Sequence, residues 1–442
     1  MQCRPYQRWR TVGLAVAAIT LPALSPACQR LPATNGSDEG AEPNDTFSRA
    51  RLISLATGET AHLTGTIDQA GDIDVFGLGP MAAGDTVRTE ATRLSQRLRL
   101  AIALYDAEGE LINEDTLTSL RSLSAHPTIA HAVREDSAQV FVAVSHSYIG
   151  SSSGDYEINV SVTRDGLPPP PAAQLVVLNF SGGEFTDSLF GVIHADPLDA
   201  AAIDPLYAGQ TDDLKDVIRQ TLRQNYERFD IAFVDADDPD APPTGTVSEV
   251  LFGGDNSLAF GAAEDIDLYN LDPTDKAIIF TEAFGADTFS PSPSVSEIAT
   301  AIGNVAAHEL GHLLGLHHVN DAAALMDEAS PAVTLLDDQE FMRAPLAAAI
   351  FPLGHQDSAD LLRVILGSNP QAAQAALDLR RFSALPYWLT DEAGALRIST
   401  SPARTECKTG SLPGKCLTCM KREGQAGRGP LKDFFANRAH NE

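Results

Sequence analysis

The stretch HELGHLLGLHHV, residues 308–319, carries four histidines and one glutamate in twelve positions. His308 and His312 are four residues apart, so an α-helix of 3.6 residues per turn places both imidazoles on one face. Gly315 follows, and glycine tolerates the left-handed backbone conformation that often ends a helix. After that turn, His318 can return beneath the same point. The pattern therefore predicts three histidines that meet at one ion.

A capped helix is expected to carry the first two histidines. In PSVSEIATAIGNVAAHELGHLLG, Ser294 is followed three residues later by Glu297, which is the signature of a capping box at a helix start. Glu309 is next to His308 and points about 100° around the helix, beside the ion rather than on it. A carboxylate in that place can take a proton from an activated water and later return it to a leaving amine.

Three neutral imidazoles and one water make a four-coordinate zinc site with an open position, which is a catalytic arrangement and not a closed structural one. The spacing from Gly315 favours His318 over His317 as the third ligand. His317 is then expected to face solvent or to line the substrate cleft, and an exchange of the two roles is the alternative. His194 and His355 have no ligand spacing and are expected to be ordinary.

Eight residues after His318 comes Met326, in AALMDE. HELGHLLGLHH and ALM at this separation resemble the zinc motif and Met-turn of the metzincin metallopeptidases, closest to the matrixin-like branch. The resemblance covers residues 174–368 and implies an α+β, zincin-type domain with a mixed sheet and a long active-site helix. It also implies that Met326 forms an apolar floor beneath the three histidines; a plain core methionine is physically almost the same reading.

Some residues depart from the pattern of that family, and the resemblance does not decide whether one acidic loop binds calcium. Asp327 follows Met326, where matrixins often have an aromatic residue. No tyrosine follows the Met-turn, and no cysteine-switch propeptide precedes the domain, so neither a tyrosine ligand nor thiolate latency is expected. Structural calcium and a solvated acidic loop are equal alternatives for one carboxylate-rich loop, whose members are Asp265, Asp267, Asn270, Asp272 and Asp275.

Residues 42–163 are expected to form a β-sandwich. In DYEINVSV, alternation places Tyr156, Ile158, Val160 and Val162 on one side of a strand. AEPNDTFSRA, GDIDVFGL, ALYDAEGELI and GDYEINVSV, in that order, resemble the bacterial pre-peptidase C-terminal domain, which implies a secreted β-sandwich appended to a peptidase. Calcium binding and ordinary solvated turns are both open for three carboxylates, Asp45, Asp72 and Asp74.

Amino-acid composition indicates the character of the remaining segments of the 442-residue chain. The net charge of −29 disfavours nucleic acid and anionic membranes as partners. RDGLPPPPAA, residues 164–173, is a proline-rich linker expected to hold two domains apart. Residues 369–442 are expected to be a disordered or loosely structured basic tail. A zinc knuckle on its cysteines is disfavoured, because only His440 is available as a fourth ligand to Cys407, Cys416 and Cys419.

The N-terminus is typical of an export signal. Arg4, Arg8 and Arg10 precede the apolar run TVGLAVAAITLPAL, and small residues precede Cys28, so residues 1–27 are expected to be a signal peptide and 28–41 a linker. Lipidation of Cys28 and simple secretion are alternatives; no later apolar run reaches spanning length. The remaining cysteine is Cys3, and no cysteine lies within residues 29–406, so that region is expected to have no disulfide.

These features together predict a secreted zinc metalloendopeptidase in which His308, His312 and His318 hold zinc and Glu309 acts on water. The substrate would be an extended protein or peptide lying along an edge strand. Two rival interpretations remain: a non-catalytic surface or adhesion protein that retains a zinc-binding scaffold, and a zinc amidase of non-protein substrates. Cleavage specificity and oligomeric state have no readable signal in the sequence.

Overall fold

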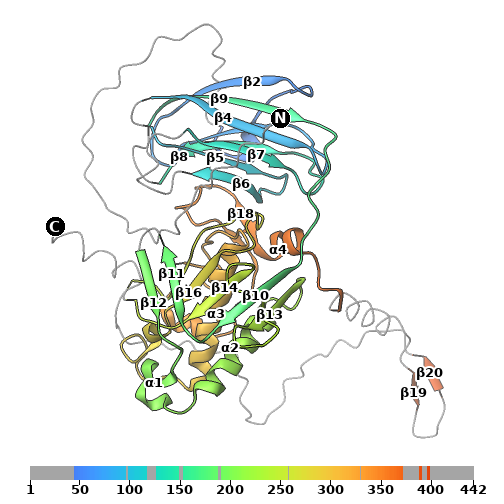
Figure 1. The fold of residues 1–442 in the computed structure, drawn as a ribbon. Helices are drawn as coiled ribbons and strands as arrows, with labels where there is room; N and C mark the ends of the chain where they lie inside the picture. Colours follow the sequence, from blue (N-terminus) through green and yellow to red (C-terminus); the bar gives the residue numbers. More distant parts are fainter. Residues whose placement is uncertain are drawn as a thin grey trace, which may run out of the picture.

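The structure, a computed structural model, describes residues 44–371 except 96–97, 117–125, 149–152, 188–190, 257 and 329, together with the segments 388–390 and 396–398 (Figure 1). The expected signal peptide, the linker 28–41 and all five cysteines lie outside these residues. In the described part of the chain, no helix is long and apolar enough to span a membrane.

Two stacked sheets form the N-terminal β-sandwich, in the orders β1-β3-β8-β5-β6 and β2-β9-β4-β7. The alternation predicted for β9 is confirmed, because Tyr156, Ile158, Val160 and Val162 are all buried in the sandwich core. The elements are η1 (Phe47–Arg49), β1 (Arg51–Leu52), β2 (Thr60–Ile67), β3 (Ile73–Gly77), β4 (Thr86–Leu94), β5 (Leu100–Tyr105), β6 (Leu111–Thr116), β7 (Thr128–Ala132), β8 (Phe141–His146) and β9 (Gly154–Thr163).

The second half contains a five-stranded mixed sheet in the order β13-β10-β14-β16-β15. Its first four strands are parallel, and the edge strand β15 is antiparallel to β16. The strands are β10 (Gln174–Asn179), β11 (Gly183–Asp187), β12 (Gly191–Ala195), β13 (Ile231–Asp235), β14 (Ser248–Phe252), β15 (Gly261–Ala263), β16 (Lys276–Ile279), β17 (Arg343–Pro345) and β18 (His355–Asp357). With its helices, this domain confirms the predicted α+β class preceded by an all-β sandwich.

Helices α2 and α3 pack together against this sheet around one large apolar core, and Gly303 lets α3 approach Thr221 of α2 closely. The hairpin β11–β12 covers part of the opposite face, where Phe185 packs with Leu251. The helices are α1 (Ala200–Ile203), η3 (Pro205–Tyr207), α2 (Thr211–Asn225), η4 (Thr281–Phe284), α3 (Val295–Leu313), η5 (Ala332–Leu336) and α4 (Ser358–Leu366).

The two helix starts differ in how well the sequence predicts them. The capping box at Ser294 and Glu297 is present, with both reciprocal hydrogen bonds. Thr211, in contrast, matches the pattern of an N-cap but is the first residue of α2, and Gln210 precedes it without a side-chain cap. The Thr211 hydroxyl accepts a hydrogen bond from the Ala200 N–H instead, at 3.1 Å, so a contact with α1 replaces the local cap.

The expectation that the linker holds the domains apart is wrong. The outer face of the sheet that contains β5 and β8 packs on the loop after β17, where Tyr105 and Phe141 share a buried cluster with Phe351. Figure 1 shows β18 and α4 at this boundary. An extended linker sets the distance along the chain but not the distance between surfaces, and burial of these apolar faces favours docking.

One short hairpin lies within the region expected to be a loose tail. Its strands, β19 (Trp388–Thr390) and β20 (Leu396–Ile398), pair antiparallel. The tail therefore includes local structure, while its cysteines lie outside the described residues.

The capping box yields a test of what starts α3. Ser294→Ala removes the hydroxyl that accepts from the Glu297 N–H and should lower the free energy of unfolding by about 1 kcal/mol. Ser296→Ala, on the exposed first turn of the same helix, is the matched control. Thermal and denaturant unfolding measure both variants; an equal effect of the two substitutions would contradict the cap.

Candidate metal centre

Helix α3 supplies the first two histidines from a position surrounded by the core. Its C-terminal half is almost wholly buried, with His312 3% exposed and Leu310 fully buried. Gly311 has no side chain because Met326 needs the space: a Cβ there would lie 2.7 Å from the methionine sulfur. Met326 is itself fully buried and lies against the helix between the two histidines, while its role as the floor of a metal site stays a prediction.

The chain then turns at Gly315, as the sequence predicts. Its φ of +91° belongs to the left-handed region, and the Leu316 N–H donates to the Gly311 carbonyl at 2.9 Å to close the helix. A Cβ on Gly315 would also lie 2.8 Å from the Asp267 carbonyl oxygen. Glycine is thus required here for both its backbone conformation and its size, and the turn delivers His318 back to the helix.

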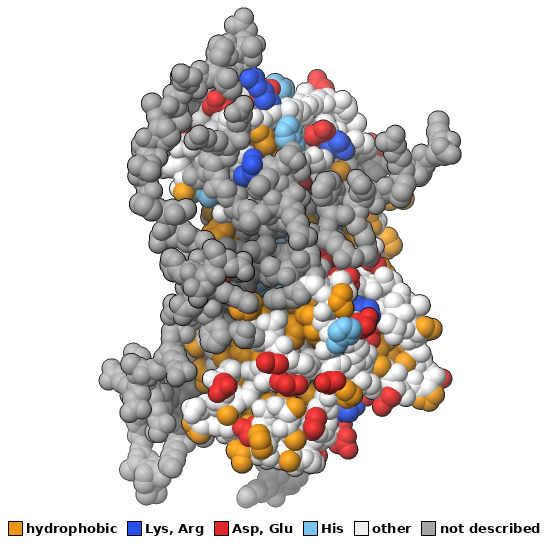
Figure 2. Space-filling view, turned by 60° about the vertical axis from the view of Figure 1, so that its left-hand side comes forward, with side chains coloured by type: hydrophobic (Ala, Val, Ile, Leu, Met, Phe, Trp, Pro, Cys, Tyr) orange, Lys and Arg blue, Asp and Glu red, His pale blue; other side chains and the backbone are white. Residues whose placement is uncertain are grey.

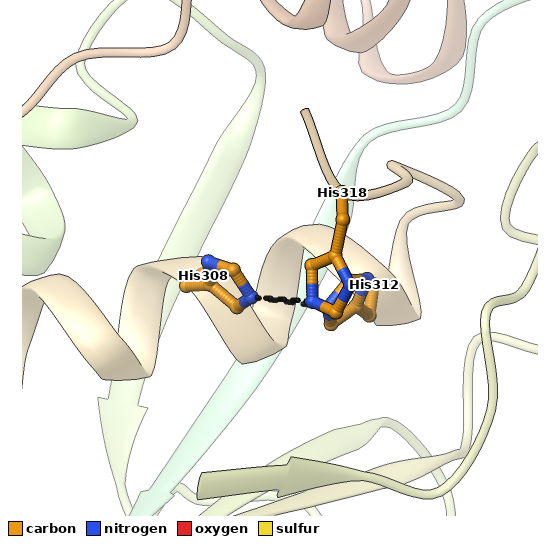
Figure 3. A group of neighbouring side chains, drawn as sticks. All are labelled: His308, His312 and His318. Atoms are coloured by element: carbon orange, nitrogen blue, oxygen red, sulfur yellow. Dashed lines mark hydrogen bonds between the residues drawn. The ribbon is translucent and has the colours of Figure 1, made fainter. Parts of the chain in front are cut away.

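The three predicted imidazoles converge (Figure 3). The Nε2 atom of His312 lies 3.1 Å from that of His308 and 3.0 Å from that of His318, and the third separation is 3.2 Å. Within the described residues, this is the one set of three His, Cys, Asp or Glu side chains whose ligand atoms lie within 4.8 Å of one another. The three side chains that the sequence pattern selects thus lie together, and zinc binding by them stays a prediction.

The partner of Nδ1 in each histidine ring shows whether the short Nε2–Nε2 distances are hydrogen bonds. The Nδ1 atom of His308 lies 2.8 Å from the Leu325 carbonyl, and that of His312 lies 2.7 Å from the Leu316 carbonyl. A carbonyl only accepts, so Nδ1 carries the proton in both rings and Nε2 presents a lone pair. Three facing lone pairs do not hydrogen-bond to one another; they make a ligand set for a cation.

The third histidine has a carboxylate as its partner. His318 Nδ1 lies 3.0 Å from Glu328 Oε2, where the other two rings have backbone carbonyls. A carboxylate in this position fixes the tautomer and the orientation of the ring. Sequence reasoning missed Glu328; its signal is an acidic residue two positions after the Met-turn methionine.

The donor set fits zinc. Tetrahedral coordination with Zn–N distances of about 2.0–2.1 Å places ligand nitrogens about 3.3 Å apart, close to the separations found here. Burial lowers the pKa of His308 to about 3 and that of His312 well below its usual range, so both rings are in the neutral form that binds metals. Among the described residues no fourth ligand joins the three histidines, and such a set matches a catalytic rather than a structural site.

Glu309 lies beside this group and against the edge strand. A Cβ on Gly261 of β15 would lie 2.7 Å from Glu309 Cγ, so the missing side chain of Gly261 makes room for the carboxylate. Burial raises the pKa of Glu309 to about 8, opposed by a backbone hydrogen bond from Ala263. A cation nearby would favour the ionised form. Gly261 is a second residue that sequence reasoning missed, since only the folded chain brings β15 to α3.

His317 does not face solvent, and that expectation is wrong. It is 1% exposed and lies against β6 of the sandwich, with Nε2 3.7 Å from Glu114 Oε1. Its backbone is held on both sides by the Gln356 amide, at 2.8 and 2.9 Å. Burial lowers the pKa of His317 to about 3 and raises that of Glu114 to about 7. The cause is the docked sandwich, which covers this histidine.

Three of the carboxylates considered for calcium accept hydrogen bonds from the protein itself. Asp74 accepts from the Tyr156 hydroxyl at 2.6 Å, Asp267 from the Asp272 N–H at 2.6 Å, and Asp275 from the Ser248 hydroxyl at 3.0 Å. Asp74 and Asp275 are buried, so neither is the solvated carboxylate of the alternative interpretation. Calcium binding at either set stays a prediction.

Comparison with known proteins agrees with this geometry. Residues 212–341 match the family model described as Matrixin, which confirms the resemblance for the segment containing the three histidines and Met326. No curated protein matches the chain significantly. The family match and the three-histidine group together support a zinc metallopeptidase.

Several solved structures show local similarity. Archaemetzincin from Methanopyrus kandleri is 13% identical over 44% of this chain and 95% of its own, with a TM-score of 0.23. A zinc-dependent peptidase from Methanocorpusculum labreanum is 14% identical over 38% and 93%, with a TM-score of 0.21. The pre-peptidase C-terminal domain of collagenase from Bacillus anthracis is 12% identical over 28% and 100%, with a TM-score of 0.20. Nothing about this chain's activity follows from similarity at this level.

Glu328 gives a direct test of the metal centre. Glu328→Gln keeps the shape of the side chain but removes the negative charge beside His318, and should weaken zinc binding about tenfold. Competition with a chromogenic chelator measures the affinity. Glu340→Gln, a change of the same kind at another position after the Met-turn, should bind zinc as the wild type does; an unchanged affinity for Glu328→Gln would contradict the assigned contact.

Proposed function

We propose that this protein is a secreted zinc metalloendopeptidase that hydrolyses peptide bonds of extracellular proteins. The observation that carries the proposal is the convergence of three histidine Nε2 atoms within 3.2 Å of one another. The buried side chain of Glu309 accompanies them, and its described contacts include no ion pair with a histidine or an arginine. A purely structural zinc site has four protein ligands and needs no such carboxylate.

The three histidines, His308, His312 and His318, would hold the zinc through Nε2. Zinc, when bound, supplies a Lewis acid toward a carbonyl oxygen and toward water. The protein's own part is to keep the ligands fixed. Leu325 and Leu316 carbonyls orient two rings and the Glu328 carboxylate orients the third.

Glu309 would move the proton. As a carboxylate it accepts a proton from the attacking water at a side-chain oxygen, and as the acid it then donates that proton to the leaving amine. Burial raises the pKa of Glu309 and a bound cation would lower it again, so a bound zinc would favour the carboxylate form that accepts the first proton.

The edge strand β15 supports an extended peptide as substrate. It pairs with β16 on one side and ends the described sheet on the other, and its Gly261 touches Glu309. A peptide added along this edge would receive main-chain hydrogen bonds and pass the carboxylate. On the face of the second domain that Figure 2 shows, Asp and Glu side chains outnumber Lys and Arg, which disfavours nucleic acid as a partner of that face.

Export is supported by the basic and then apolar N-terminus, residues 1–27. We keep the domain boundaries predicted from the sequence, with the β-sandwich at residues 42–163 and the catalytic domain at residues 174–368. The remaining alternative at the N-terminus, a lipid anchor on Cys28, would keep the same enzyme at the cell surface.

Glu309→Gln tests the chemistry. The amide cannot accept the proton, so kcat should fall by about 10²- to 10⁴-fold while zinc binding persists. Casein hydrolysis and metal content measure the two properties, and Glu227→Gln, in the exposed turn that follows α2, is the control. If the variant cleaves casein at the wild-type rate, the mechanism is wrong. If the wild type cleaves no protein but releases products from amide-bearing cell-wall fragments, it is an amidase.

Gly261→Ala tests the contact between the edge strand and the carboxylate. The added methyl group would displace Glu309, so kcat should fall about tenfold or more with zinc content unchanged. Ala262→Gly, at the next residue of β15 on the opposite face, should have little effect on kcat. Steady-state kinetics with a fluorogenic peptide separates the two; equal rates for both variants would remove Gly261 from the site.

A further inference from the structure

The β-sandwich reaches the metal centre through two loops of the second domain. The first loop follows β17. Phe351 packs in a cluster with Tyr105 and Phe141 of the sandwich, and the Tyr105 hydroxyl donates to the Leu353 carbonyl at 2.7 Å. Gly354, with φ of +86°, has no room for a side chain because Tyr105 fills the space. The loop is therefore fitted to the sandwich surface.

The same loop holds the backbone of the third histidine. The Ala347 N–H donates to the His318 carbonyl at 3.0 Å, and Leu346 forms an antiparallel bridge with Val319. Leu346 is also a member of the cluster shared with the sandwich. Leu346 and Ala347 thus connect the surface of the sandwich to His318, the residue that completes the histidine group.

The second loop carries Tyr269, which inserts into the sandwich. Its hydroxyl donates to the Ile112 carbonyl at 2.7 Å, its ring lies 4.6 Å from the His131 ring, and Arg134 lies over it at 4.8 Å. The backbone of Tyr269 has φ of +65°, a conformation uncommon for tyrosine that the surrounding contacts must hold.

This loop presses on the turn between the second and third histidines. The Asp267 N–H donates to the His312 carbonyl at 3.0 Å, and the Tyr269 nitrogen lies 2.8 Å from where a Cβ of Gly315 would be. His317, the residue before the third histidine, is covered by Glu114 of β6. The turn that carries His318 is therefore enclosed by the sandwich and by loops docked on it.

We infer that the β-sandwich braces the metal centre: its docking through Tyr105 and Tyr269 fixes the turn that carries His318, so zinc affinity depends on the domain interface. The inference rests on the proposed zinc site but not on peptidase chemistry. It gives the sandwich a structural role within the enzyme, distinct from that of a detachable targeting module. By linkage, zinc binding must strengthen the docking by the same factor.

Paired tyrosine substitutions test the brace in the full-length protein. Tyr105→Phe with Tyr269→Phe removes two hydroxyls that cross the interface and leaves two part-buried carbonyls, those of Leu353 and Ile112, without that donor. The control, Tyr156→Phe with Tyr207→Phe, removes two hydroxyls that bond within one domain each, to Asp74 and to the Pro293 carbonyl. Phe351→Ala, with Phe289→Ala as its control, is a stronger pair at the same interface.

Chelator competition measures zinc affinity for all variants. The brace predicts about three- to tenfold weaker binding for the tyrosine interface variant, a larger loss for Phe351→Ala, and little change for the controls. Hydrogen exchange should also show lower protection of β5 and β6 when zinc is removed from the wild type. Equal zinc affinity in interface and control variants would overturn the brace and leave the zinc site standing. A wild type that binds no zinc would overturn both.

Discussion

Three imidazole lone pairs directed at one point repel one another and are costly to hold together in a buried site without a positive charge. Here they lie 3.0–3.2 Å apart, and each ring's other nitrogen already has an oxygen partner, so the rings cannot relieve the repulsion by sharing protons. The surrounding structure can be understood as what keeps this arrangement in place until a cation stabilises it. Zinc then links the helix to the turn, and its binding energy adds to the stability of the fold.

Several layers of packing support the centre. Met326 fills the space left by Gly311, and the Met-turn backbone pairs with the third ligand's neighbour through the hydrogen bond from the Val319 N–H to the Met326 carbonyl, at 3.0 Å. Asn304, one turn before the first histidine, donates to the Leu335 and Asp337 carbonyls at 3.0 and 2.8 Å. It ties the loop after the Met-turn to α3. Packing and hydrogen bonds therefore join the helix, the Met-turn and the following loop, which is the kind of support that a preorganised catalytic site requires.

The parts of the site that depend on local chain geometry were predictable from the sequence. His308 and His312 follow helical spacing, Gly315 follows the conformational limits of other residues, and Ser294 with Glu297 marks the helix start. The parts that depend on contacts between distant segments were not. Gly261 and Glu309 are 48 positions apart, and Glu328 meets His318 only after the Met-turn has folded. His317 was misjudged because a histidine after a turn is usually solvated, and no local signal announces that a second domain covers it. The prediction that the proline-rich linker holds the domains apart was wrong for the same reason, because the stiffness of a linker does not determine whether the two domain surfaces bind each other.

Zinc K-edge X-ray absorption on the full-length, zinc-loaded protein tests the central claim most directly, because it reports the atoms bound to the metal. The account predicts one zinc per chain, with three imidazole nitrogens and one oxygen at about 2.0–2.1 Å. Sulfur atoms at about 2.3 Å would place the metal on the cysteines of the tail instead and contradict the three-histidine centre, as would a protein that takes up no zinc.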